Sequence, residues 1–122
     1  MKYIGKIVLC AALVLLLNAC SRDIQVDKKA EDAIRCRVLT EIVVSTAKAN
    51  PNDFASELEN LEIALNAFEI IELKYSKEHQ VDEASMHDIE KKYFKEYAGK
   101  SFKELLIECG AEFHDDLSKI VN

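Results

Sequence analysis

The feature that most constrains the fold of this chain is a long seam of large apolar residues. Its members follow one another at spacings of three or four: Phe54, Leu58, Leu61, Leu65, Phe68, Ile71 and Tyr75. This spacing places the side chains along one face of an α-helix, which turns once in about 3.6 residues. The sequence therefore predicts a helix that starts near Pro51, runs to about Lys77 and is buried along one face.

A short polar sequence, Asn-Pro-Asn-Asp at residues 50–53, separates this helix from the segment before it. Proline disfavours the helical conformation in the preceding residue and is common at the first position of a helix. Asn50 is therefore expected to cap the helix, with Pro51 at its first position and Asp53 at its third. The sequence therefore predicts a tight corner between two helices at residues 50–53.

Two further helices are predicted on either side of this one. Residues 28–49 are apolar around much of the helical circumference, which predicts a first helix in a central, well-covered position. Residues 76–81 are polar and predict a loop. A third helix is expected to start at Asp82 or Ser85 and to end at Gly99, because glycine readily adopts the left-handed conformation that follows a helix end.

The last helix is predicted from residue 101 to the C-terminus. Ser101 and Glu104 have the spacing of a capping box. Gly110 should weaken this helix by about 1 kcal/mol without having to break it. One apolar stripe follows the whole segment: Phe102, Leu106, Cys109, Phe113, Leu117 and Ile120. The prediction is an all-α fold of about four helices, in a small bundle or in stacked helical hairpins.

The N-terminal residues have the organisation of an export signal. Lys2 and Lys6 form a positive region, residues 7–17 are an uninterrupted apolar run, and small or neutral residues lead to Cys20. The apolar run is well short of the ~20 residues that a membrane-spanning helix needs. Residues 1–19 are therefore predicted to be a cleaved signal peptide rather than a permanent transmembrane helix.

The sequence Leu17-Asn18-Ala19-Cys20 resembles the lipobox of bacterial lipoproteins, in which an aliphatic, a variable and a small residue precede a modified cysteine. Asn18 is a less usual occupant of the variable position. The resemblance covers residues 1–20 alone. It implies cleavage before Cys20, diacylation of the Cys20 thiol and, usually, acylation of the new amino group, which together make a stable membrane anchor. The alternative is a secreted protein with an incidental cysteine at its cleavage site.

The same resemblance bears on location. In enteric bacteria, Asp after the modified cysteine retains a lipoprotein at the inner membrane, so Ser21 favours the outer membrane, facing the periplasm. Residues 20–27 would form the lipidated N-terminus and a short tether. Residues 28–122 are enough for one compact helical domain and too few for two.

The charge of the mature chain limits its partners. Without the signal, which carries two lysines and no acids, 14 basic and 22 acidic residues remain, a net charge of −8. An acidic protein is a poor candidate for binding nucleic acid or anionic lipid and a better one for binding a basic protein. The oligomeric state is left open.

Two of the four cysteines remain once Cys10 leaves with the signal and Cys20 is lipidated. Cys36 and Cys109 both lie within apolar stripes and should point into one core. In an oxidising compartment they are expected to form a disulfide between the first and last helices, in preference to two buried free thiols. Closing so long a loop would stabilise the fold by roughly 4 kcal/mol.

Two surfaces are candidates for contact with a partner. The first is an acidic stripe on the second helix, formed by Glu59, Glu62, Asn66, Glu69 and Glu72; its alternative interpretation is a solvated outer face. The second is a segment of lysines and aromatic residues on the third helix, with Lys91, Lys92, Tyr93 and Lys95 at its centre; its alternative interpretation is an amphipathic helix with core aromatics and surface lysines.

The sequence offers no catalytic motif and no convergent set of metal ligands. His79, His87 and His114 are scattered, and no nucleophile–base pair or phosphate-binding glycine loop is recognisable. No cofactor or metal is therefore expected, and the chain is not predicted to be an enzyme.

Three hypotheses of function follow. The first is an envelope lipoprotein that binds another protein through its acidic helical surface, for example as an inhibitor or immunity protein. The second is a structural or assembly accessory of an outer-membrane or cell-wall complex. The third, less favoured, is a small hydrolase, which would need a concave site with a titratable residue in an unusual environment.

Overall fold

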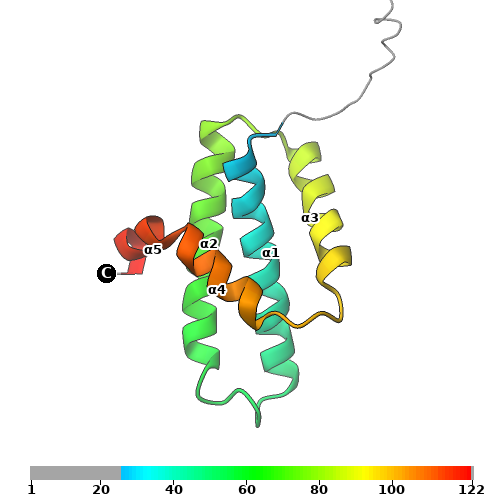
Figure 1. The fold of residues 1–122 in the computed structure, drawn as a ribbon, viewed down its shortest axis with the longest axis vertical. Coiled ribbons are helices and arrows are strands. Elements are labelled where there is room, and N and C mark those ends of the chain that lie inside the picture. Colours follow the sequence, from blue (N-terminus) through cyan, green and yellow to red (C-terminus); the bar gives the residue numbers. More distant parts are fainter. Residues whose placement is uncertain (1–25, 122) are drawn as a thin grey trace, which may run out of the picture.

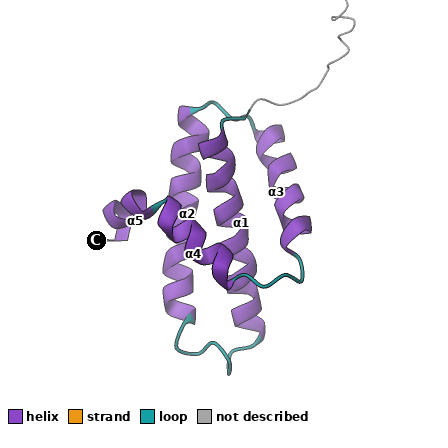
Figure 2. Cartoon of the chain, viewed as in Figure 1, coloured by secondary structure: helices purple, strands orange, loops and turns teal. Residues whose placement is uncertain are grey.

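The computed structural model describes residues 26–121, and within them it contains five α-helices and no strand. They are α1 (Lys28–Ala49), α2 (Leu58–Glu78), α3 (Glu83–Tyr97), α4 (Lys103–Glu112) and α5 (His114–Val121). In Figure 1, α1 lies between α2 and α3, α4 crosses α1 and α2, and α5 extends beyond α2. Helices joined by short loops account for the whole described part (Figure 2). The all-α prediction is confirmed, whereas the signal and lipobox lie outside the described residues.

The core forms around α1, as its apolar circumference predicted. Its side chains Ile34 and Leu39 are fully buried, and α2 contributes Phe68 and Ile71 to the same cluster. A helix buried on several sides needs neighbours on each of them, and α1 packs against α2, α3 and α4. None of the helices in the described residues is both long and apolar enough to span a membrane.

The predicted disulfide is present and joins α1 to α4. Cys36 and Cys109 are both fully buried, their Cα atoms lie 5.8 Å apart, and 73 positions separate them in sequence. The bridge therefore fixes the crossing of α4 over the central helix. It does not reach the last helix, because the segment predicted as one helix is divided in two.

The connection between α1 and α2 differs from its prediction. Asn50 ends α1 instead of starting α2: its backbone N–H donates to the Thr46 carbonyl at 3.1 Å, and its side-chain Nδ2 donates to the same oxygen at 2.9 Å. Engaged with the open carbonyls of α1, Asn50 does not serve as the N-cap of α2. Residues 51–57 form turns, and α2 begins only at Leu58.

The start of α3 follows the sequence closely. The side chain of Asp82 accepts a hydrogen bond from the Ser85 backbone N–H at 2.7 Å and thus caps the helix. The preceding loop is shorter than predicted, because α2 continues to Glu78. At the far end of α3, Gly99 has a φ of +75°, which is the left-handed conformation expected there.

Two glycines provide a matched test of this conformation. A Cβ added at Gly99 or at Gly110 would have open space around it, apart from the adjoining backbone, so the two sites differ mainly in backbone conformation. We expect Gly99→Ala to lower the free energy of unfolding by about 1 kcal/mol. Gly110→Ala, within α4, should raise it by up to about 1 kcal/mol. Urea unfolding of both variants checks this, and equal effects would contradict it.

The C-terminal segment bends at Phe113, which separates α4 from α5. The Phe113 ring is fully buried, with its centroid 6.0 Å from the Phe68 ring and 5.9 Å from the Tyr75 ring. The bend brings α5 into contact with α2, where Asp116 of α5 accepts a hydrogen bond from the Tyr75 hydroxyl at 2.8 Å. The predicted capping box is also absent here, because Phe102 occupies the N-cap position and makes no side-chain capping bond.

Candidate functional site

The first candidate surface, the acidic stripe on α2, is divided between the surface and the interior. Glu59, Asn66 and Glu69 are exposed, and Glu62 is partly exposed with its Oε2 3.4 Å from Lys48 Nζ. Glu72 is only 6% exposed and faces α1. Four of the five predicted residues therefore remain available to a partner.

Glu72 belongs to an internal ion cluster around Arg37 of α1. Arg37 Nε donates to Glu72 Oε1 at 2.6 Å, and its two terminal nitrogens donate to Glu41 and to Glu90 of α3. Burial raises the pKa of the Glu72 carboxyl, and the negative charges of Glu90 and Glu69 add to that effect, while Arg37 opposes it. One cation thus serves three carboxylates and ties α1 to α2 and α3.

The outward face of α2 also carries apolar side chains that the sequence reasoning missed. Ile63, Ile70 and Leu73 are 46%, 51% and 66% exposed, and they lie on the side opposite the buried seam. Their positions form a second helical stripe with Asn66, a pattern visible in the sequence once the buried side is assigned. We call Glu59, Glu62, Ile63, Asn66, Glu69, Ile70 and Leu73 the α2 face.

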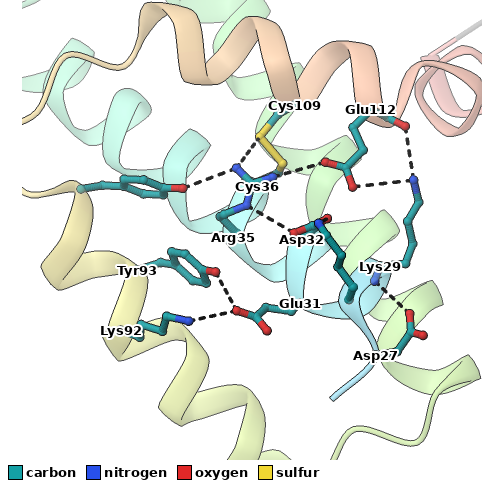
Figure 3. Close-up of polar contacts among 12 residues, drawn as sticks. Asp27, Lys29, Glu31, Asp32, Arg35, Cys36, Lys92, Tyr93, Cys109 and Glu112 are labelled. Carbon is teal, nitrogen blue, oxygen red and sulfur yellow. Dashed lines mark hydrogen bonds and ion pairs between the residues drawn. A yellow bond between two sulfur atoms is a disulfide. The ribbon is translucent and has the colours of Figure 1, made fainter. Parts of the chain in front are cut away.

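The second candidate surface, on α3, is also partly internal. The Tyr93 hydroxyl donates to Glu31 Oε2 at 2.6 Å, and Lys92 Nζ donates to the same oxygen at 3.1 Å (Figure 3). Burial and the bond to Glu31 raise the pKa of Tyr93 well above its usual value. These contacts bind α3 to α1, whereas Lys91 and Lys95 are exposed.

A third polar cluster surrounds Arg35, close to the disulfide (Figure 3). Its guanidinium donates to Glu112 Oε1 at 3.3 Å and to the Tyr97 hydroxyl at 3.4 Å, and its Nε lies 3.5 Å from Asp32 Oδ1. These contacts connect α1 with α3 and α4. The cluster therefore acts across the same interface that the bridge closes covalently.

The two carboxyls at Arg35 have pKa values displaced in opposite directions. Burial raises the pKa of Glu112, and the adjacent Asp32 raises it further. Burial alone would also raise the pKa of Asp32, but interactions with Glu112, Lys28 and Arg35 hold it below its usual value. Such a pair is typical of acid–base sites. Here Asp32 and Glu112 both pair with cations at a helix interface. Neither residue lines the apolar cavity described in the next paragraph.

An apolar cavity lies at the end of the bundle where α1 joins α2. It has a volume of about 360 Å³ and lies between α1, the 51–57 connection, α2 and the beginning of α4. Five apolar residues line it, with three charged residues: Val43, Phe54, Leu61, Phe102, Leu106, Asp53, Glu57 and Lys103. We call this cavity the end groove. The sequence reasoning missed it because it placed Phe54 inside the second helix.

Across residues 26–121, no three His, Cys, Asp or Glu side chains converge in a way that could hold an ion.

Comparison with protein-family models, with curated proteins and with solved structures gave no match to this chain.

Proposed function

We propose that this protein is a lipid-anchored binding protein of the bacterial envelope that captures a basic protein partner through the α2 face. The observation that carries the proposal is the composition of that face. Ile63, Ile70 and Leu73 are exposed beside the carboxylates of Glu59 and Glu69. An exposed stripe of large apolar side chains is unusual for a solvated helix face and typical of an interaction surface.

The apolar side chains and the carboxylates of the α2 face would contribute to binding in different ways. Apolar side chains at the centre of an interface lose contact with water and provide most of the affinity. Carboxylates around them favour a basic partner, accelerate its approach and exclude acidic competitors. A role as inhibitor or immunity protein suits this arrangement, because it requires a stable charged surface and no catalytic centre.

The proposal includes a lipid anchor at Cys20, which would keep the protein at the membrane. The Leu17-Asn18-Ala19-Cys20 sequence supports cleavage before Cys20 and lipidation of its thiol, and Ser21 favours the outer membrane, facing the periplasm. A tether of residues 20–27 would hold the helical domain near the membrane surface. A domain confined there meets its partner at a raised effective concentration, so moderate intrinsic affinity would suffice.

Charge reversal on the α2 face tests the proposal. The partner is first identified by crosslinking and pull-down from the native envelope, with Cys20→Ala as a control for the anchor. We expect the double variant Glu62→Lys, Glu69→Lys to weaken binding of the purified partner at least ~10-fold, because like charges then face each other. Isothermal titration at two salt concentrations measures the effect.

The matched control is Glu96→Lys, Glu108→Lys, which makes the same change in net charge at exposed positions of α3 and α4. It should change affinity less than ~3-fold, through long-range electrostatics only. If the two double variants weaken binding equally, net charge rather than the α2 face determines capture and the proposal is wrong.

A second function is an accessory role in an outer-membrane or cell-wall complex. Its support is the pair Lys91 and Lys95, which are exposed one helical turn apart and form no ion pair within residues 26–121. Lys91→Ala, Lys95→Ala should abolish retention on purified cell wall or envelope complexes under this hypothesis. Under the first hypothesis, the same variant should bind the basic partner as the unmodified protein does.

A further inference from the structure

We propose that the end groove is an anchor site for one large apolar side chain of the partner, next to a basic side chain that pairs with Asp53 or Glu57. This inference rests on the proposed function and extends it, because it adds a concave site to the α2 face. It also specifies the recognised element as an aromatic or aliphatic residue adjacent to Lys or Arg.

The volume and the lining residues of the groove suit an inserted apolar side chain. Its volume of about 360 Å³ falls within the range of about 300–1,000 Å³ typical of sites that bind small ligands. Phe54, Phe102 and Leu106 contribute from the connection and from α4, opposite Val43 and Leu61. An inserted side chain would therefore be surrounded by apolar atoms, which is the environment of energetically dominant interface residues.

The charges at the groove select its occupant. Asp53 and Glu57 are both exposed, and their carboxylates form no ion pair or side-chain hydrogen bond among the described residues. Lys103 is the one cation in the lining, so carboxylates outnumber it by two to one. A fatty acid or acidic peptide would bring a further negative charge to these carboxylates, whereas a basic segment would neutralise them.

The groove and the α2 face both include residues from the beginning of α2. Leu61 lines the groove, and Glu59 and Glu62 of the same turn belong to the α2 face. Leu61 belongs to the buried seam, on the side of α2 opposite the α2 face, so a partner that uses both sites must extend around the end of α2.

A short synthetic peptide, with tryptophan between two lysines, probes the groove without knowledge of the natural partner. We expect it to shift the amide NMR signals of Phe54, Leu61 and Leu106 during a titration of isotope-labelled protein. Two matched peptides, with alanine for tryptophan or glutamates for both lysines, should each bind at least ~10-fold more weakly. Shifts confined to other residues, or equal affinity for the alanine peptide, would overturn the inference.

Two variants test the same site in different ways. Leu106→Phe fills the groove, and Asp53→Asn, Glu57→Gln removes its charge at exposed positions where folding does not depend on packing. Each should weaken the tryptophan peptide and the natural partner at least ~10-fold. Glu96→Gln, Glu108→Gln is the control for lost charge, and circular dichroism confirms that each variant is folded.

The outcomes separate this inference from the proposed function. If reversal at Glu62 and Glu69 abolishes capture while the groove variants keep full affinity, the groove is not used and the α2 face stands alone. If the groove variants lose affinity while the reversal has no effect, the α2 face is not the capture surface. If neither changes affinity, both proposals are wrong.

Discussion

Replacing Cys36 and Cys109 together with alanine should lower the free energy of unfolding by about 4 kcal/mol. The bridge closes a loop across 73 positions, so its loss restores a large conformational freedom to the unfolded chain. For a domain of this size, each kcal/mol corresponds to roughly 4–8 °C in melting temperature. The melting temperature should therefore fall by roughly 15–30 °C, as measured by circular dichroism.

Reduction provides the control for this effect. A reductant should lower the melting temperature of the unmodified protein towards that of the double variant and leave the variant itself unchanged. Both cysteines are fully buried, so the alanines add a small packing loss that the reduced protein does not suffer. A loss below about 1 kcal/mol would show that core packing alone fixes the crossing of α4 over α1.

Replacing Arg37 with methionine should cost about 3–5 kcal/mol at neutral pH, the second large effect. Methionine fills much of the same space but leaves Glu41, Glu72 and Glu90 close together without their cation. The matched control is Lys48→Met, which breaks the exposed ion pair with Glu62 and should cost less than about 1 kcal/mol. Urea unfolding at neutral pH compares the two.

The pH dependence of this loss has a definite sign. The pKa of Glu72 is already raised in the native protein, so its protonated form stabilises the fold at low pH and that contribution disappears as pH rises through its pKa. Without Arg37, the interaction that opposes this rise is lost, so the pKa of Glu72 rises further. The cost of Arg37→Met should therefore shrink between about pH 7 and about pH 4. A cost that is constant with pH would contradict this account.

A second substitution in the same cluster completes the test. Glu72→Gln, added to Arg37→Met, removes the most buried of the unpaired carboxylates and should restore part of the lost stability. If the double variant is less stable than Arg37→Met alone, Glu72 contributes through packing or hydrogen bonds rather than through its charge.

The clusters around Arg35 and Arg37 also bear on function. In these clusters, Arg35 and Arg37 of α1 pair with carboxylates of α2, α3 and α4. The ion pairs therefore help to fix the positions of these helices around α1. The end groove and the α2 face lie outside these clusters. Charge variants at exposed positions of the proposed binding surfaces should therefore leave stability nearly unchanged, whereas Leu106 packs against the core and Leu106→Phe requires its own measurement of stability.

Local patterns in the sequence determined the helical fold. Apolar spacing identified α1, α2, α3 and the C-terminal segment that the structure divides into α4 and α5, and Asp82 and Gly99 marked the ends of α3. The apolar positions of Cys36 and Cys109, together with the export signal, predicted their bridge. The helix ends and the apolar faces depend on residues within a few turns of one another, because capping and amphipathicity are properties of a single helix. Such properties do not require knowledge of the neighbouring helix.

Which charged and apolar residues of the helices are exposed depends on the tertiary structure. Glu69 and Glu72 belong to the same acidic stripe in sequence, yet Glu69 is exposed, whereas Glu72 is buried and pairs with Arg37 of α1, which also pairs with Glu90 of α3. The end groove likewise requires residues from α1, α2, α4 and the connection together. Periodicity specifies which side of a helix is buried, whereas the side chains that meet across helices depend on how those helices cross.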